Sequence, residues 1–568
     1  MKLNGSDIIA EVLIEQGVDT IFGYPGGAVL NIYDALYKYR DKIRHVLTAH
    51  EQGAAHAADG YARATGRTGV VLATSGPGAT NLVTGIATAY IDSVPMVAIT
   101  GNVGTSLIGR DAFQEVYITG ITMPITKHNF MVQNISELAS VLREAFRIAN
   151  SGRKGPVLVD IPKDITAAVT DFEPQPPVPI VDETVLDEEK LQRAAALINA
   201  ARCPVIELGG GVASADASDI ARAVVEKTGI PTCHTLMATG VLGYDEPLNY
   251  GLVGMHGNLV TNKAIDEADL LLAIGTRFSD RVALDPEHFA SHATIIQIDI
   301  DNSEINKNVR VDEYLTGDVK TILTALLPLL EEKTHDDWLA RLAKFKKQDY
   351  TPKDSDDFLT PHALVRAICE GTDKETIYVT DVGQHQMWAA QYLSHTKSRD
   401  FLTSGGLGTM GYGYGAAIGA QIGCPEKRVV HITGDGSFHM NLNEACTAVS
   451  NHLPIITVIF DNRVLGMVRQ WQTCFYGKRY SQTDPERQTD FVKVIEGFGG
   501  KGYHAHTLEE FKAAYKAAQQ ADGPVWIACD IQKDARVVPM IPAGKTVDSI
   551  LLADSCATCE KQCYKQEN

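Results

Sequence analysis

The feature that most constrains how this chain can fold is an internal repeat. When the sequence is shifted by 359 positions, two segments align without a gap, one in each half of the chain. Chance similarity between two α/β segments is the alternative explanation, because small residues and valines align easily. The residues that coincide are Ala57-Ala58 with Ala416-Ala417, Gly60 with Gly419, Val70-Val71 with Val429-Val430, Thr74 with Thr433, Thr88-Ala89 with Thr447-Ala448, and Pro95 with Pro454.

Both copies predict the same order of structural elements. A helix rich in Gly and Ala leads to a β-branched strand, a Gly-containing turn and another helix. A strand that opens after a proline then follows, at Pro95-Met96-Val97-Ala98-Ile99 and at Pro454-Ile455-Ile456-Thr457-Val458. Apolar strands that alternate with helices predict parallel sheets covered on both faces. Each copy should therefore form a doubly wound α/β domain.

A third α/β segment lies between the two copies. It contains three apolar, strand-like runs, at 204–211, 269–275 and 295–301. Because 568 residues are too many for one hydrophobic core, we expect three such domains and two linkers. The expected domains are 1–175, 185–345 and 358–540, followed by a C-terminal tail at 541–568, and the expected linkers are the proline-rich 174–179 and the charged 331–357.

The charge balance excludes some classes of partner. A formal net charge of -19 argues against nucleic acid or an anionic membrane, since both need a basic face. No apolar run reaches the roughly 18 residues of a membrane span, and the first residues lack the apolar core of a signal peptide. We therefore expect a cytoplasmic protein, unless a targeting segment was removed before residue 1.

Three of the ten cysteines stand close together in the polar C-terminal stretch, at Cys556, Cys559 and Cys563. Three thiols could bind a metal or respond to oxidants. A fourth ligand is missing, however, and the spacing fits no zinc pattern. We therefore interpret these three cysteines as part of a tail without a specific metal or redox role.

The second copy carries candidate metal ligands. Its strand at 429–433 runs into Gly434-Asp435-Gly436-Ser437, and Asn462 follows the next strand, at 455–460. Both side chains would emerge at the carboxyl edge of neighbouring parallel strands, where open α/β sheets bind ligands. Carboxylate, amide and carbonyl oxygens are the donors that Mg²⁺ prefers, with phosphate oxygens completing its shell. Gly-Asp-Gly-Ser alone is usually a plain turn, but the downstream asparagine favours a magnesium–phosphate site.

The first copy differs at the equivalent positions. Gly76 stands where the second copy has Asp435, so the first copy cannot hold a metal in the same way. It has Glu51 at the expected start of a helix, and the shift places Glu51 on Met410. Each residue also has a purely structural explanation. Glu51 could be a carboxylate favoured by the helix dipole, and Met410 could be a methionine that fills the core.

These residues resemble a known family. Gly434-Asp435-Gly436 with Asn462 is similar to the signature of thiamine-diphosphate-dependent enzymes, and Glu51 in its His50–Arg63 setting resembles their coenzyme-activating glutamate. The resemblance covers nearly the whole chain and is closest to the catalytic large subunit of bacterial acetohydroxyacid (acetolactate) synthases. Four further blocks carry it: 111–115, 125–129, 383–391 and 465–471.

The resemblance implies a transferase that decarboxylates pyruvate and joins the fragment to a second 2-keto acid, pyruvate or 2-ketobutyrate. This is the first common step of isoleucine and valine (branched-chain amino acid) biosynthesis. Glu51 would exchange a proton with the coenzyme, and Met410 would support its bent form beside the Gly408 carbonyl. The implied diphosphate contacts are Gly383, Gln384, His385, Gly436 and Ser437, and the implied Mg²⁺ ligands are Asp435, Asn462 and the Val464 carbonyl.

The same resemblance implies a substrate channel. In it Arg281 would pair with the incoming carboxylate, and Trp471 would favour 2-ketobutyrate; without the resemblance these two would be a surface charge and ordinary core. Gln114 and Lys127 are implied as catalytic, and Phe113 and Met467 as substrate contacts.

The resemblance also implies FAD in the central domain. One departure bears on it, because Met123 stands where plant-like members carry an arginine against the flavin, although bacterial members often lack that arginine too. The implied flavin contacts are Thr235, Leu236, Met237, Met255, His256, Gly257, Gly275, Arg277, Asp280, Asp299, Ile300 and Asp318.

In the family the two copies around each coenzyme come from different subunits, which implies at least a homodimer, or a homotetramer, with active sites at the interface. A small regulatory subunit is also implied. The nearest alternatives are a pyruvate oxidase-like enzyme and a catabolic, FAD-independent acetolactate-forming enzyme. A catalytically silent flavin-binding or assembly protein is an alternative of another class, and the presence of Glu51, Asp435 and Asn462 argues against it.

Overall fold

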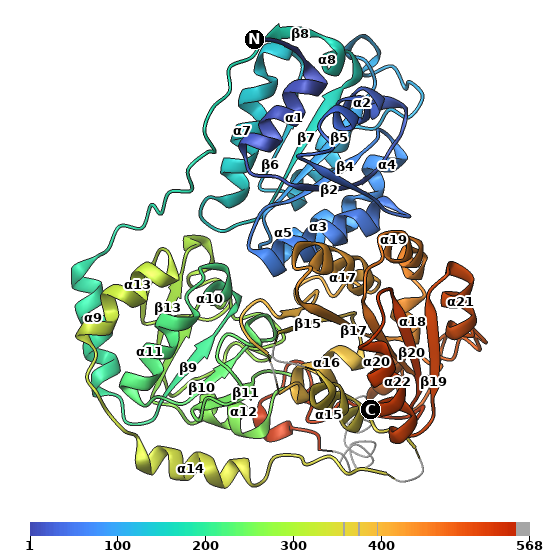
Figure 1. Ribbon diagram of the computed structural model, residues 1–568. Coiled ribbons are helices and arrows are strands. Elements are labelled where there is room, and N and C mark those ends of the chain that lie inside the picture. The colour runs from blue at the N-terminus through green and yellow to red at the C-terminus, as the bar shows by residue number, and fades with distance from the viewer. Residues whose placement is uncertain (356–357, 373–374, 395, 553–568) are drawn as a thin grey trace.

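The computed structural model describes residues 1–355, 358–372, 375–394 and 396–552. Within these residues the chain forms three six-stranded parallel sheets, one in each third of the sequence (Figure 1). A short antiparallel pair, β1 (Lys2–Asn4) with β8 (Val169–Asp171), joins the two ends of the first third. The predicted class, three doubly wound α/β units, is confirmed.

The first and last sheets have the same strand order. The N-terminal sheet runs β3-β2-β4-β5-β7-β6, and the C-terminal sheet runs β16-β15-β17-β18-β20-β19. Strands fill equivalent places in the two orders, and this equivalence extends beyond the ungapped alignment, which supports the predicted repeat. The bounds are β2 (Thr20–Tyr24), β3 (Arg44–Leu47), β4 (Gly69–Ala73), β5 (Met96–Asn102), β6 (His128–Met131) and β7 (Pro156–Pro162), then β15 (Thr376–Thr380), β16 (Phe401–Leu402), β17 (Arg428–Gly434), β18 (Ile456–Asp461), β19 (Lys501–Ala505) and β20 (Val525–Asp530).

Helices cover both faces of these two sheets because apolar residues line both faces of the parallel strands. On the N-terminal sheet they include α1 (Gly5–Glu15), α2 (Leu30–Lys38), α3 (Glu51–Thr65), α5 (Val83–Ile91) and α7 (Leu138–Asn150). On the C-terminal sheet they include α15 (Pro361–Gly371), α16 (Gln384–Tyr392), α17 (Tyr412–Gly423), α20 (Gly466–Phe475), α21 (Phe491–Phe498) and α22 (Leu508–Ala518).

The two copies meet where α3 packs against α17 (Figure 1). A Cβ on Gly60 would overlap the backbone of Ala416, and a Cβ on Gly419 would overlap the backbone of Ala57. The 359-residue shift turns the first of these pairs into the second. The contact is therefore approximately two-fold symmetric, and glycine is required on both sides because the helix backbones touch.

The middle sheet has the order β11-β10-β9-β12-β13-β14 and two cores of its own. Its strands include the three apolar runs predicted between the copies. The bounds are β9 (Pro204–Leu208), β10 (Thr232–His234), β11 (Asn249–Leu252), β12 (Leu270–Ile274), β13 (Thr294–Asp299) and β14 (Glu313–Thr316), with α9 (Glu188–Ala200), α10 (Gly210–Ser214), α11 (Ser218–Thr228), α12 (Leu259–Asp266) and α13 (Val319–Leu326) as helices.

The two expected linkers differ in structure. Residues 172–187 contain no helix or strand and cross from the first third to the second (Figure 1). The charged stretch 331–357, by contrast, contains α14 (Asp336–Lys346), whose Trp338 and Leu342 are buried against the middle unit. The prediction of a linker is therefore wrong at α14, where a charged helix packs through one apolar stripe.

The C-terminal stretch begins as packed chain. Ile541 and Val547 join a small apolar cluster with Leu259 of the middle unit. The Cys556, Cys559 and Cys563 group lies outside the described residues. Among the helices that the structure describes, none is both long and apolar enough to cross a membrane.

Candidate active site

The predicted metal ligands lie at one edge of the C-terminal sheet. β17 runs directly into the short helix α18 (Asp435–Phe438), and β18 ends one residue before Asn462. The two strands are paired neighbours, so their carboxyl ends lie side by side. Asp435 and Asn462 are both buried there, as predicted.

Electrostatics at this edge favour a cation. Burial, together with repulsion from Asp461, raises the pKa of Asp435 to about 7. Asn462 turns its amide oxygen toward the backbone of Val464, whose N–H donates to it at 3.2 Å. The donors are oxygens from a carboxylate, an amide and the backbone, which is the chemistry that Mg²⁺ accepts. In the described part of the chain no group of three or more His, Cys, Asp or Glu side chains could hold a metal by itself.

The start of α16 faces the same edge. A Cβ on Gly434 would meet the ring of His385, so that glycine allows the histidine to approach the backbone. Burial lowers the pKa of His385 to about 4, and among the described residues its Nε2 has no hydrogen-bond partner. Gln384 donates to Gln470 at 3.0 Å. Gln384 and His385 thus adjoin the Asp435 edge, and His385 is a neutral imidazole with one free ring nitrogen.

Glu51 is the first residue of α3, as predicted, and is nearly buried. Its carboxylate accepts a hydrogen bond from Asn81 Nδ2 at 2.9 Å, and its other oxygen lies beside Gly78. Gly76, at the place of Asp435, has a φ of +59° and packs against the backbone of Gln114. The first copy therefore presents a carboxylate and a glycine turn, whereas the second presents the edge that carries Asp435 and Asn462.

The loop before α17 carries the two remaining coenzyme candidates. Gly408 has a φ of +67°, which favours glycine, and Met410 is half-buried. Ser437 and Gly411 connect this loop to α18, because Ser437 Oγ accepts a hydrogen bond from the Gly411 N–H at 3.1 Å. The loop and the edge that carries Asp435 therefore belong to one connected region.

Two residues predicted for the substrate channel lie elsewhere. Phe113 is 87% exposed on the segment before α6 (Ile118–Thr122). Lys127 donates to the carbonyls of Ile148 and Ser151, the latter at 2.6 Å, where α7 ends. Burial lowers the pKa of Lys127 to about 8. Neither residue lines the large cavity described next, and Gln114, which lies beside Gly76, does not line it either, so the three predicted roles stay predictions.

A cavity of about 1340 Å³ lies where the three units meet. Its wall includes Arg281, Met467 and Trp471 from the predicted substrate set and Gly383 and Gly408 from the predicted coenzyme set. All the predicted flavin residues except Gly257 also line it, namely Thr235, Leu236, Met237, Met255, His256, Gly275, Arg277, Asp280, Asp299, Ile300 and Asp318. Gly257 is one turn behind, hydrogen-bonded to Gly254.

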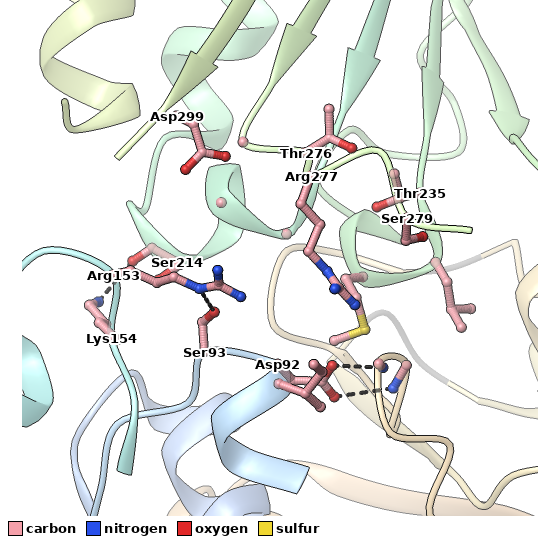
Figure 2. A pocket seen from close by; sticks show the side chains of 18 of the residues that line it. Asp92, Ser93, Arg153, Lys154, Ser214, Thr235, Thr276, Arg277, Ser279 and Asp299 are labelled. Atoms are coloured by element: carbon pink, nitrogen blue, oxygen red, sulfur yellow. Dashed lines mark hydrogen bonds between the residues drawn. The ribbon is translucent and has the colours of Figure 1, made fainter. Parts of the chain in front are cut away.

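The chemistry of this wall suits an extended, partly anionic ligand. Gly211 and Gly275 approach so closely that a Cβ on either would overlap the other's backbone, which leaves a shallow glycine cradle. Figure 2 shows Thr235, Thr276, Arg277, Ser279 and Asp299 around the space. Burial raises the pKa of Asp299 to about 6.

Sequence reasoning missed the basic residues that the first unit contributes to this cavity. Arg153 forms ion pairs with Glu304 at 2.7 Å and Asp301 at 3.3 Å, and it donates to Ser93 at 2.8 Å (Figure 2). Lys154 donates to the Ser214 carbonyl at 2.9 Å. An Arg-Lys pair between glycines, at 152–155, was the available signal, since glycines flanking cations are typical of anion-binding loops.

Three family models match this chain in the order of its sheets. They are "Thiamine pyrophosphate enzyme, N-terminal TPP binding domain" at 3–121, "central domain" at 191–326 and "C-terminal TPP binding domain" at 381–529. With the duplicated fold and the edge at Asp435, they define the chain as a thiamine pyrophosphate enzyme, and therefore as one that binds thiamine diphosphate.

Curated relatives narrow the family. The probable acetolactate synthase large subunit of Methanocaldococcus jannaschii is 46% identical over 97% of this chain and 95% of its own length. The acetolactate synthase isozyme 2 large subunit of Escherichia coli is 44% identical over 97% of this chain and 99% of its own length. The acetolactate synthase large subunit of Corynebacterium glutamicum is 46% identical over 97% of this chain and 90% of its own length. This chain belongs to the acetolactate synthase large-subunit family, and is a thiamine-dependent carboligase.

Proposed function

We propose that this chain forms acetolactate by decarboxylating pyruvate and joining the two-carbon fragment to a second 2-keto acid, pyruvate or 2-ketobutyrate. The observation that carries the proposal is the complementary difference between the two copies. One presents Glu51 at the start of α3 and the other presents Asp435 and Asn462 at the carboxyl edge of two paired parallel strands. A single thiamine diphosphate needs both kinds of group, an acid–base carboxylate and a metal anchor.

Asp435, Asn462 and the Val464 carbonyl are proposed to hold Mg²⁺, with His385, Gln384, Gly383, Gly436 and Ser437 along the diphosphate. The unpartnered Nε2 of His385 and the buried Asp435 carboxyl support this assignment, because a diphosphate oxygen could accept a hydrogen bond from Nε2 and a cation would stabilise the carboxylate.

When bound, thiamine diphosphate supplies the electron sink for decarboxylation and ligation. The chain's own residues would do the rest. Glu51, held by Asn81 in a buried position, would exchange a proton with the coenzyme. Met410 and Gly408 would support its bent form. Gln114, Phe113 and Lys127 from one copy, with Arg281, Met467 and Trp471 at the cavity, would receive the second keto acid and exclude water.

We propose that FAD occupies the cavity between the three units. The glycine cradle at Gly211 and Gly275, the buried carboxyl of Asp299 at the end of β13 and the basic pair Arg153-Lys154 fit a nucleotide that carries a diphosphate. His256 also has a buried Nδ1 without a hydrogen-bond partner among the described residues. Met123, which stands where plant-like members carry an arginine against the flavin, is 64% exposed on the first unit.

A homodimer or homotetramer is proposed because Glu51 accepts a hydrogen bond from Asn81 within the N-terminal copy, whereas the charged groups that act on Asp435, Asp461 and Arg487, belong to its own C-terminal copy. Pairing with a second chain would bring a Glu51 to each Asp435. Exposed Phe113, Tyr117 and Leu407 supply apolar surface for such an interface. The small regulatory subunit and the cytoplasmic location stay predictions.

The test uses the purified chain with pyruvate, Mg²⁺ and thiamine diphosphate, with and without FAD and 2-ketobutyrate, and measures acetolactate and oxygen uptake. We expect product, a preference for the mixed acceptor, and a fall of at least about 100-fold on Glu51→Gln, the usual scale for one acid–base group. Glu188→Gln is the matched control, because Glu188 is also the first residue of a helix but lies in the middle unit.

Two outcomes would contradict the proposal. Oxygen uptake that matches pyruvate consumption would indicate a pyruvate oxidase-like reaction. Full activity of Glu51→Gln would show that this carboxylate does not activate the coenzyme.

A further inference from the structure

Two loops that are equivalent in the repeat present the proposed coenzyme contacts. The loop before α3 leads into Glu51, the first residue of that helix, and the loop before α17 carries Gly408 and Met410. Backbone groups that are removed from water need hydrogen-bond partners, and in both loops some of these partners come from the opposite copy. The structure supplies one buried carboxylate for each loop.

Glu444 holds the first loop. This residue of the C-terminal copy is fully buried, and its two oxygens accept hydrogen bonds from the N–H groups of His50, at 3.0 Å, and Ala49, at 3.1 Å. Thr447 donates a third bond at 2.6 Å. A Cβ on Gly53 would overlap the Glu444 carboxylate, so the glycine permits this approach. The two peptide groups before Glu51 are therefore fixed from the opposite copy.

Asp92 holds the second loop in the same manner. This residue of the N-terminal copy accepts hydrogen bonds from the N–H groups of Gly406, at 2.8 Å, and Gly405, at 3.1 Å (Figure 2). Its side chain is only 2% exposed and pairs with Arg63 at 2.9 Å. A second bond across the copies, between the hydroxyls of Thr88 and Thr409 at 2.8 Å, lies one residue from Met410.

The two carboxylates are not needed by the α/β fold as such. The repeat has Gly85 at the place of Glu444 and Asn451 at the place of Asp92, so each copy lacks the anchor that the other provides. A residue that only supported the shared fold would be expected in both copies. Glu444 and Asp92 instead each occur in one copy only, and each contacts a loop whose chemistry differs between the copies.

We infer that Glu444 and Asp92 are positioning residues, each fixing in the opposite copy the loop that presents Glu51 or Gly408 and Met410 to the coenzyme. This inference rests on the proposed function for the roles of Glu51 and Met410. Charge-assisted bonds to consecutive amides hold a backbone more firmly than neutral ones, and a displacement of about 1 Å at a reacting group can cost on the order of 100-fold in rate.

The test compares Glu444→Gln and Asp92→Asn in the full chain with thiamine diphosphate and Mg²⁺. Each change keeps the shape of the side chain but replaces one carboxylate oxygen with an NH₂ group, which cannot accept a hydrogen bond from a backbone N–H. Amide hydrogen exchange should become faster at 46–52 in the first variant and at 403–411 in the second, and kcat should fall about tenfold in both. Exchange that is unchanged at these loops would overturn the inference.

Asp269→Asn is the matched control. Asp269 also accepts from two consecutive N–H groups, those of Arg202 at 2.8 Å and Cys203 at 2.9 Å, but in the middle unit. Exchange should rise locally there while kcat stays within about twofold. An equal fall of kcat in this variant would show that any such backbone anchor matters, and the positioning role would be withdrawn.

A double-mutant cycle separates positioning from general stability. If Glu444 acts through Glu51, Glu444→Gln should cost no further activity in the Glu51→Gln background. A further tenfold loss there would contradict the inference. If the unmodified chain makes no acetolactate, or if Glu51→Gln is fully active, the proposed function fails. In that case amide hydrogen exchange still decides whether the Glu444 and Asp92 carboxylates hold the two loops.

Discussion

At the scale of single residues, the buried carboxyl groups carry most of the information about function. Burial raises the pKa of Asp435 and of Asp299 in the two regions where we propose that phosphate or nucleotide binds. Burial also raises the pKa of Glu207, to about 7, on the middle strand β9. Glu207 accepts from Thr276 at 2.7 Å, while among the described residues its other oxygen has no partner. It therefore supports the turn that lines the cavity at an electrostatic cost.

Glu207→Gln should make the protein more stable at alkaline pH. Because the folded pKa lies above the usual value of 4.5, the folded state binds the proton more tightly, and stability is lost as pH rises from about 4.5 through about 7. The variant, which has no proton to lose, should escape a penalty on the order of 3 kcal/mol at pH 8. Thermal unfolding from pH 5 to pH 8 measures this, with the exposed Glu226→Gln as control. Parallel pH profiles for both variants and the parent would refute it.

At the scale of elements, the crossing of α3 and α17 sets the geometry of the first and last units. Gly60 and Gly419 allow the helices to touch, and the hydroxyl of Tyr412 donates to Asp59 at 2.7 Å inside the same contact. Since α3 begins at Glu51 and α17 follows Met410, this crossing also sets where both residues lie.

Gly419→Ala should destabilise the protein by about 2 kcal/mol or more, because its methyl group would overlap the Ala57 backbone and backbone relaxes less readily than a side chain. Gly497→Ala in α21 is the control, since no heavy atom lies within 4 Å of its new Cβ. That change should be neutral or stabilise by up to about 1 kcal/mol. Urea unfolding of both variants checks the contrast, and equal effects would show that the helices do not touch here.

At the scale of the whole molecule, the cavity joins three units that are otherwise separate along the chain. Ile180, Val181 and Val185 of the irregular segment 172–187 are exposed and line this cavity. A ligand bound there would contact all three units and the segment that connects two of them. Ligand binding is therefore expected to stabilise their arrangement.

FAD should slow cleavage of the 172–187 segment by a glutamate-specific protease. Glu183 lies on the cavity wall, so a bound flavin would hold its backbone in place. Glu486, which is exposed and does not line that cavity, serves as the internal reference. Cleavage at Glu183 should slow several-fold relative to Glu486 when FAD is added. The same ratio with and without FAD would contradict binding at this cavity.

Much of the fold and part of the candidate site could be predicted without the structure. Strands and helices follow from apolar periodicity, and Asp435, Asn462 and Glu51 stand directly at the ends of such elements. Local pattern is enough for residues of this kind. Local pattern gives the wrong prediction at α14, because the charged residues of this helix outnumber its two buried apolar residues.

The sequence by itself determined the duplication, the parallel strands and the difference in chemistry between the copies, because each of these is written in local periodicity or in an alignment of the chain with itself. Only the tertiary structure decided which residues meet across copies. Glu444 reaches His50 over 394 positions and Asp92 reaches Gly406 over 314. Contacts at such separations depend on how the helices α3 and α17 pack, and packing is a property of the whole surface rather than of any local pattern.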